Sequence, residues 1–382
     1  MCKKHSNKEQ INLNKKVGVI TMHGVINYGS FLQAYATQQA ISKLGYECEI
    51  IDYKFPNDWH ISNGLKQNKI RYFINNKIYS LGLSKGHRKT KKIKNAISEH
   101  LNLSAEYRSR KEIREKPPVY DVYITGSDQT WNTKHTMGDS TFLLDFVPDE
   151  KKKIAFSASL ARKKIDEKFI DQFERLMRRY NNISIRDTNG SLAIKEITGF
   201  EPEVTLDPTL LLDKETWVKF ASNKINKYEG KKYIVFYLIT HSFDPRPYIY
   251  NLLKDLQDET KLEVFSFSKI PKEFDITFTD CSDIGVEDFI HLFANASYVV
   301  TSSFHGTAFA ANFGIPMYSI VNDLDAGDDR QSSLLNKLEI SNCLVTQDMP
   351  FRYIQPRYEV NIQQVKLQRL RERSFEYLKN SI

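Results

Sequence analysis

The stretch KVGVITMHGVINYGSFLQAYATQQAISKLGYECEIIDY, residues 16–53, indicates the class of fold that the chain adopts. Its first eight residues, 16–23, are mostly apolar and rich in β-branched side chains, which is typical of a buried strand. Apolar residues then recur at helical spacing until Gly45, a residue that suits the C-terminal cap of a helix. Residues 47–53 are typical of a second strand. Together these segments predict a β-α-β unit, which opens a parallel sheet.

The alternation of short apolar runs and helical patterns continues along the 382-residue chain. Since domains average about 150 residues, this length fits two of them. Further strands are expected at 120–125, 153–157, 182–185 and 203–206 in a first group, and at 232–240, 262–266, 297–301 and 317–321 in a second. We therefore expect an α/β fold of two parallel-sheet domains with a central cleft. Open sheets of this kind bind ligands at the carboxyl ends of their strands.

The predicted organisation has an N-terminal α/β domain at residues 1–212 and a C-terminal α/β domain at 231–358. A polar, Lys-rich linker at 213–230 joins them. The basic, Tyr-rich segment 57–118 lacks clean strand patterns, so we expect a helical insertion in the first domain. The highly charged residues 359–382 are expected to form a helical tail.

The composition excludes several classes of protein. Hydrophobic residues make up 41% of the chain, enough to fill two ordinary cores. This composition excludes a disordered or a collagen-like protein. The four cysteines lie too far apart for a zinc or Cys-x-x-Cys site, which predicts reduced thiols. Residues 1–16 lack the apolar stretch of a secretory signal, and no apolar run is long enough to span a bilayer. These features predict a cytoplasmic protein.

The formal net charge is +8, and basic residues concentrate at 84–95 with more at 108–116. Three interpretations of residues 84–95 are considered: a solvated helix face or loop, a patch that contacts a membrane surface, and a patch that binds nucleic acid. The solvated face is favoured, and peripheral membrane contact stays open. Because no recognition helix, zinc finger or RNA-binding signature accompanies the stretch, we expect no nucleic-acid partner.

Candidate functional residues cluster where predicted strands end. The first group is Ser303, Phe304, His305, Gly306 and Thr307, between a strand and a helix expected to begin near Gly306. Free N–H groups at the start of a helix favour an anion, and imidazole titrates near neutrality, so His305 suits proton transfer. The alternative is a histidine that caps its own loop.

A second group, Asn27, Tyr28, Gly29 and Ser30, follows the first strand. Gly29 would let the backbone approach a ligand, and Ser30 would cap the next helix. The same four residues equally suit a plain turn followed by an N-cap.

A third group is the polar loop that contains Ser127, Asp128, Gln129 and Trp131. An indole ring can cover the apolar face of a sugar, and Asp128 can serve as a carboxylate base, so the loop suits sugar binding. The alternative is an Asx-type turn with a buried tryptophan.

Two arginines at the ends of predicted elements are candidate anion ligands. Arg186 can bind a carboxylate or phosphate, or pair internally with Asp187 or Glu203. Arg330 can reach the cleft as a second cation, or form a surface ion pair with its neighbours. The acidic loop before Arg330 lacks the ligand spacing of a calcium loop, so no metal is predicted. Dinucleotide, P-loop and nucleophile-elbow motifs do not occur in the sequence.

Taken together, these segments resemble the polysaccharide pyruvyl transferase family. Each matching segment is short, and the resemblance is specific because the segments occur together and in the same order along the chain. The segment 57–118 and the tail carry no matching motif. The matching segments are 17–21, 27–35, 123–132, 185–187, 206–211, 303–307 and Arg330 ahead of Leu334 and Leu335.

The resemblance implies a glycosyltransferase-B-like fold of two Rossmann-like domains. It also implies transfer of the pyruvyl group of phosphoenolpyruvate (PEP) to hydroxyls of a sugar, as a ketal, in capsule, exopolysaccharide or cell-wall biosynthesis. In this family the motif histidine, His305, looks like the acid/base group, and Arg186 looks like an anion partner for PEP. Some members carry Arg-Leu-His where this chain has Ser303-Phe304-His305, so Arg330 is the candidate for the second cation.

The resemblance demands no cofactor or metal beyond PEP as donor substrate, and it leaves the acceptor open between lipid-linked, nucleotide-linked and polymeric glycans. Two other functions stay open on the same architecture. One is a nucleotide-sugar-dependent glycosyltransferase, although the second half of the chain shows no obvious nucleotide-specific acidic signature. The other is a non-catalytic glycan-binding scaffold, because fold does not fix function.

Overall fold

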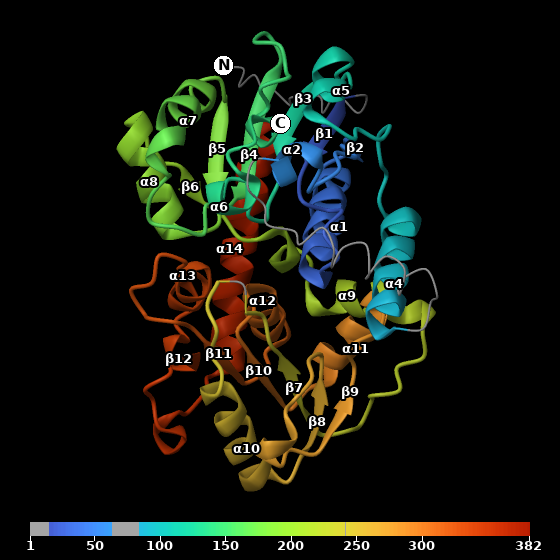
Figure 1. Ribbon diagram of the computed structural model, residues 1–382, viewed down its shortest axis with the longest axis vertical. Coiled ribbons are helices and arrows are strands. Elements are labelled where there is room, and N and C mark those ends of the chain that lie inside the picture. Colours follow the sequence, from blue (N-terminus) through green and yellow to red (C-terminus); the bar gives the residue numbers. More distant parts are fainter. Residues whose placement is uncertain (1–14, 63–83, 241) are drawn as a thin grey trace, which may run out of the picture.

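The computed structural model describes residues 15–62, 84–240 and 242–382. It contains two six-stranded sheets in which every strand pairing is parallel, with the strand orders β2-β1-β3-β4-β5-β6 and β12-β11-β10-β7-β8-β9. The two sheets lie one above the other along the long axis of the molecule, with helices around them (Figure 1). The predicted fold of two parallel-sheet α/β domains is confirmed.

The strands of the first sheet all precede the predicted linker, and those of the second sheet all follow it. The first sheet contains β1 (Lys16–Ile20), β2 (Glu47–Ile50), β3 (Val122–Thr125), β4 (Lys152–Ala158), β5 (Asn182–Ile185) and β6 (Glu203–Val204). The second contains β7 (Tyr233–Tyr237), β8 (Glu263–Ser266), β9 (Phe278–Asp280), β10 (Tyr298–Thr301), β11 (Met317–Ile320) and β12 (Leu344–Val345). The exact limits of the domains stay predictions.

The strand order reverses between β1 and β3 in the first sheet and between β7 and β10 in the second. Loops that leave two neighbouring parallel strands at such a point diverge and open a crevice at their carboxyl ends, which is where ligands bind. Three groups of candidate site residues from the sequence lie in the segments that follow β1, β3 and β10.

The helices of the first half of the chain are α1 (Tyr28–Lys43), α2 (Asp58–Ser62), α4 (Lys85–His100), α5 (Arg110–Glu115), α6 (Thr133–Thr136), α7 (Ile170–Met177) and α8 (Thr188–Thr198). Those of the second half are α9 (Lys214–Phe220), α10 (Tyr248–Thr260), α11 (Val286–Asn295), α12 (Phe304–Phe313), α13 (Arg330–Lys337) and α14 (Val360–Ser381). The expectation that the helix after β10 begins near Gly306 is wrong. It begins at Phe304, because the Ser303 side chain caps it by accepting a hydrogen bond from Gly306 N.

In the expected insertion at 57–118 the structure describes the helices α2, α4 and α5, while residues 101–109 are irregular, with isolated bridges from Leu103 to Ile50 and from Tyr107 to Tyr53. Residues 63–83 lie outside the described part. Basic side chains of α4 reach the second domain. Lys85 pairs with Asp280 and Arg88 with Asp283, each at 2.6 Å. The interpretation of 84–95 as a solvated helix face fits α4, in which only Ile93 and Ala96 are buried, and the partly exposed side chains of Lys85 and Arg88 in addition join the domains. Among the described helices, none is long and apolar enough to cross a membrane.

The C-terminal helix α14 runs back from the second domain to the first (Figure 1). Its Ser374 Oγ accepts a hydrogen bond from Leu206 N at 3.0 Å, and its Tyr377 hydroxyl donates to Ala155 O at 3.1 Å. Leu367 and Leu378 on the same helix are fully buried. The predicted helical tail is confirmed as a helix, and it packs into the body of the molecule.

Candidate active site

A cavity of about 480 Å³ lies between the two domains, at the carboxyl ends of β1, β3 and β10. Both domains contribute to its wall. The side chains that line it include Met22, Val25, Asn27, Ser30, Phe55, Asp128, Gln129, His135, Ile239, Ser242, Phe243, Ser302, Ser303, Phe304, His305, Asn322, Asp328, Arg330 and Gln331. The cleft predicted between the sheets therefore holds a cavity large enough for a small charged molecule together with part of a second substrate.

His305 stands in the first turn of α12, at the cavity wall. Its Nε2 has no hydrogen-bond partner among the described residues and lies 3.9 Å from Asp207 Oδ2. Gly29 supports the other side of the ring, since a Cβ at this position would come within 2.1 Å of His305 Nδ1. The backbone at Gly29 thus approaches the imidazole of His305 closely, where the sequence led us to expect the approach of a ligand.

Burial lowers the pKa of His305 to about 4, against the opposing pull of Asp207 and with a further contribution from the Arg186 charge. The ring is therefore neutral near pH 7. A neutral imidazole with an unpartnered nitrogen can take a proton from a hydroxyl and return it elsewhere.

Asp207 is the carboxylate partner of His305, and the sequence analysis gave it no role. Its Oδ2 accepts hydrogen bonds from Arg186 Nη1 at 2.5 Å and from Ser127 Oγ at 2.9 Å, while Thr209 donates to Oδ1. Burial alone would raise the pKa of Asp207, but the Arg186 charge and these donors lower it to about 2. A role for Asp207 could have been predicted from its position in the Leu206-Asp207-Pro208 segment, which comes just after the sixth strand of the first sheet.

Arg186 stands behind the cavity wall and is almost fully buried. It pairs with Asp207, lies 3.5 Å from Asp128 Oδ1, and stacks over the Phe304 ring at 4.5 Å. Neither pairing partner expected from the sequence, Asp187 or Glu203, is involved. Arg186 is not among the residues that line the cavity, since two carboxylates and the Phe304 ring surround its guanidinium, and its expected role as an anion partner for PEP stays a prediction.

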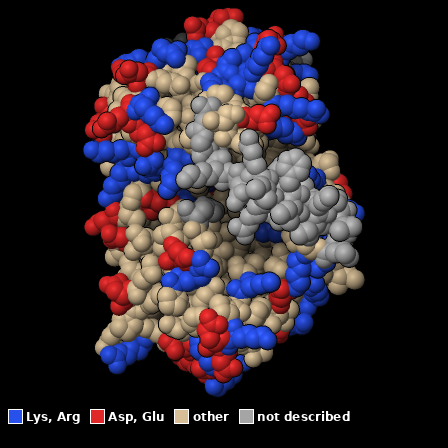
Figure 2. All heavy atoms as spheres, in the orientation of Figure 1, with Lys and Arg blue, Asp and Glu red and all other residues tan. Residues whose placement is uncertain are grey.

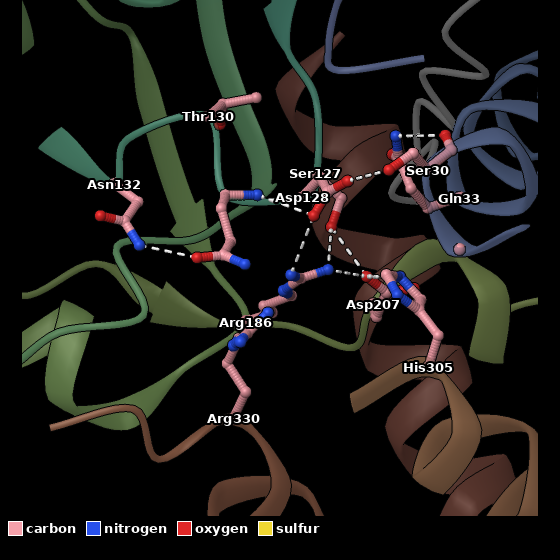
Figure 3. A network of polar contacts seen from close by, with 12 residues as sticks. Ser30, Gln33, Ser127, Asp128, Thr130, Asn132, Arg186, Asp207, His305 and Arg330 are labelled. Atoms are coloured by element: carbon pink, nitrogen blue, oxygen red, sulfur yellow. Dashed lines mark hydrogen bonds and ion pairs between the residues drawn. The ribbon is translucent and has the colours of Figure 1, made fainter. Parts of the chain in front are cut away.

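Asp128 lines the cavity and is held in place on both oxygens. Its Oδ2 accepts from Ser30 Oγ at 2.8 Å and its Oδ1 from Gln129 N at 2.9 Å. Its backbone has a φ of 74°, a conformation that is uncommon outside glycine and that clusters at functional sites. Burial acts to raise the pKa of Asp128, but the charges of Arg186 and His305 outweigh burial and hold this pKa below its ordinary value, so the carboxylate is ionised. Figure 3 shows Ser30, Asp128, Arg186, Asp207 and His305 joined in one polar network.

Five residues expected at the site have structural contacts. Trp131 is fully buried and donates from Nε1 to Phe142 O at 3.1 Å, so its ring cannot cover a sugar. Tyr28 is also fully buried, with its hydroxyl bonded to Ile284 O. Large aromatic rings gain most when they are buried and their one polar group is bonded, as here. Gly306 faces Thr301, where a Cβ would meet Oγ1 at 2.4 Å, and the Thr307 hydroxyl bonds with Ser319. Ser127 also lies beneath the surface, bonded to Asp207.

The start of α12, the start of α1 with its cap Asn27, and the start of α13 all contribute residues to the cavity wall. N-terminal N–H groups and helix dipoles favour an anion at such a place. Arg330, on α13, lines the cavity as the sequence predicted, and its Nε donates to Asp328 Oδ1 at 2.6 Å. The loops of the second domain that carry Ser242, Phe243 and Asn322 lacked any motif and were missed.

Comparison with solved structures and curated proteins places the chain among known proteins. Over 96% of this chain and 90% of that one, it is similar to a putative UDP-N-acetylglucosamine 2-epimerase from Listeria monocytogenes, at 10% identity and a TM-score of 0.49. S. aureus MnaA bound to UDP matches at 14% identity and a TM-score of 0.48, over 96% of this chain and 91% of that one. E. coli heptosyltransferase WaaC with ADP matches at 11% identity and a TM-score of 0.41, over 85% of this chain and 97% of that one.

No curated protein matches the chain. A family model described as polysaccharide pyruvyl transferase matches residues 27–323, which contain α1, the Asp128 loop, Asp207 and His305. That range covers most of the sequence and both sides of the cavity. The chain belongs to the polysaccharide pyruvyl transferase family.

Proposed function

We propose that this member of the family transfers the pyruvyl group of PEP to two hydroxyls of a sugar in a surface glycan or its precursor, forming a cyclic ketal. The observation that carries the proposal is the imidazole of His305, which is neutral near pH 7, lines the interdomain cavity and has its buried Nε2 3.9 Å from Asp207 Oδ2. The expectations that the reaction needs no metal or cofactor and that the protein is cytoplasmic stay predictions.

The charge of the cavity wall supports a donor with two anionic groups. PEP carries a carboxylate and a phosphate, and each needs hydrogen-bond donors once water is displaced. The N-termini of α1, α12 and α13 supply backbone N–H groups, and Arg330 supplies a guanidinium, of which Asp328 occupies Nε and Nη2. Arg330 thus takes the place of the arginine that some family members carry at the position of Ser303.

The chemistry needs one group that moves protons at the reacting carbon. A proton is added to the methylene carbon of PEP, which makes it a methyl group and leaves an oxocarbenium-like carbon that a first sugar hydroxyl attacks. Phosphate then leaves, and a second hydroxyl closes the ketal. The two hydroxyls release two protons in all, one that ends on the methyl group and one that ends on phosphate. His305 is the group placed to carry these protons.

The resting imidazole is neutral, so PEP itself has to make it a proton donor. Bound phosphate and carboxylate charges beside His305 favour the imidazolium, and they act against the burial that lowers its pKa in the empty cavity. Asp207, at 3.9 Å, stabilises the same charged form. Protonation of His305 is therefore coupled to binding of the donor.

The test is release of inorganic phosphate from PEP in the presence of candidate acceptor sugars, with a mass gain of one pyruvyl group on the acceptor. His305→Gln should lower turnover by about 100-fold or more, the usual contribution of a general acid–base group. His87→Gln on α4 is the control and should retain full turnover. Activity of His305→Gln equal to that of the unmodified protein would contradict the proposal. Thermal stabilisation by a nucleotide sugar alone, and none by PEP, would favour the glycosyltransferase.

A further inference from the structure

A second cavity of about 420 Å³ adjoins the first, and four residues line both of them: His135, Ser242, Gly327 and Asp328. Its other wall is basic. We call Lys134, Arg162, Lys163 and Lys164 the basic annex. No step of the proposed chemistry uses these side chains.

The basic annex is built from loops that leave neighbouring strands. Lys134 lies on α6, after β3, and the other three follow β4. The loop of Gly327 from the second domain closes on them, since a Cβ on Gly327 would lie 3.8 Å from Lys163 N. The annex is thus an extension of the same interdomain cleft. Lys and Arg side chains are spread over the face seen in Figure 2, including its left side at the middle level of the molecule.

The lysines of the annex have spare charge. Arg162 pairs with Asp166 at 3.0 Å, but no contact within the described part of the chain pairs Lys134, Lys163 or Lys164 with a carboxylate. The one carboxylate on the boundary between the cavities, Asp328, is already engaged by Arg330 and by the Ser242 hydroxyl. Three unpaired ammonium groups around one cavity favour an anion with several oxygens, such as a phosphate or diphosphate.

We infer that the basic annex binds a phosphate-bearing carrier of the acceptor, so that the acceptor is a glycosyl phosphate or diphosphate and not a finished, neutral glycan. The inference rests on the proposed function. The phosphate of PEP is joined to the reacting carbon through a single oxygen, so it has to lie beside His305, which lines only the first cavity. The annex anion is held in the adjoining cavity, so the acceptor spans from one cavity to the other. The transfer then precedes polymerisation.

The experiment measures binding of inorganic pyrophosphate by calorimetry, with and without saturating PEP, to the full chain. We expect pyrophosphate to bind while PEP is bound. The double variant Lys163→Gln/Lys164→Gln should weaken pyrophosphate binding about tenfold or more, because it removes two of the positive charges around the cavity, and should leave PEP affinity unchanged. Lys91→Gln/Lys94→Gln on α4 removes the same charge elsewhere and should alter neither ligand.

Competition between pyrophosphate and PEP, or an equal loss of both in Lys163→Gln/Lys164→Gln, would assign the annex to the donor phosphate and overturn the inference. No pyrophosphate binding to the unmodified protein would overturn it as well. If pyrophosphate binds at the annex and PEP does not bind at all, the proposed function fails while the anion site stands. UDP and farnesyl diphosphate in place of pyrophosphate distinguish a nucleotide carrier from a lipid carrier, and binding of either with PEP present supports the inference.

Discussion

At the scale of single residues, the site depends on the close approach of Gly29 to His305. A Cβ at position 29 would lie 2.1 Å from His305 Nδ1, so Gly29→Ala has to displace the imidazole from Asp207. Since a misplacement of about 1 Å can cost about 100-fold in rate, we expect phosphate release from PEP to fall by about that factor. Gly24→Ala is the matched control, because nothing lies within 4 Å of a Cβ there. Equal rates in the two variants would show that this contact does not position the ring.

The same imidazole makes stability depend on pH. The pKa of His305 is lowered to about 4 in the folded protein, and the ordinary value of about 6.5 applies to the unfolded chain. Between these values the unfolded chain binds the additional proton, so the free energy of unfolding rises with pH and its contribution from His305 is lost as pH falls from 6.5 toward 4. Calorimetric melting should show a shallower decline over this range in His305→Gln. An unchanged decline would mean that His305 is not buried and neutral.

At the scale of elements, the start of α12 has two tasks: the helix has to be capped and the anion has to be bound. Ser303→Ala removes the side-chain acceptor of the Gly306 N–H, and should cost about 1 kcal/mol of stability. Ser303→Asp keeps a good cap but adds a negative charge at the cavity wall. We therefore expect Ser303→Asp to melt near the temperature of the unmodified protein while its KM for PEP rises strongly. An unaltered KM would argue against an anion at this helix terminus.

Sequence periodicity predicts elements better than it predicts their partners. The strand Asn182–Ile185 matches its predicted bounds, and the strand Glu263–Ser266 lies within one residue of them, because their apolar pattern is local. The two-residue strand β12 and the three-residue strand β9 are too short to carry a pattern, and they were missed. The Asp207–His305 pair was missed for a different reason, since it forms only when the two domains meet. The burial of Trp131 could not be predicted from the local sequence either, because the same loop suits a buried or an exposed indole.

At the scale of the whole molecule, α14 helps to hold that domain contact in place. Arg371 on α14 donates from Nε to Leu210 O at 2.6 Å and from Nη2 to Asn312 Oδ1 at 2.5 Å, so it joins the segment after Asp207 to the helix of His305. Arg371→Leu leaves these buried acceptors unpaired and should lower the free energy of unfolding by about 1–3 kcal/mol for each, with a loss of turnover. Arg373→Leu on the same helix removes only an exposed ion pair and should cost less than about 1 kcal/mol. Denaturant titration compares the two, and equal costs would contradict this role of Arg371.

If the interdomain cavity binds PEP with its methylene carbon toward His305, a crystal structure of the protein soaked with PEP measures this directly. We expect the methylene carbon to lie against the imidazole of His305, with the phosphate and carboxylate at the N-termini of α12 and α13 and beside Arg330. PEP bound away from His305, or a cavity that takes up a nucleotide and no PEP, would contradict it.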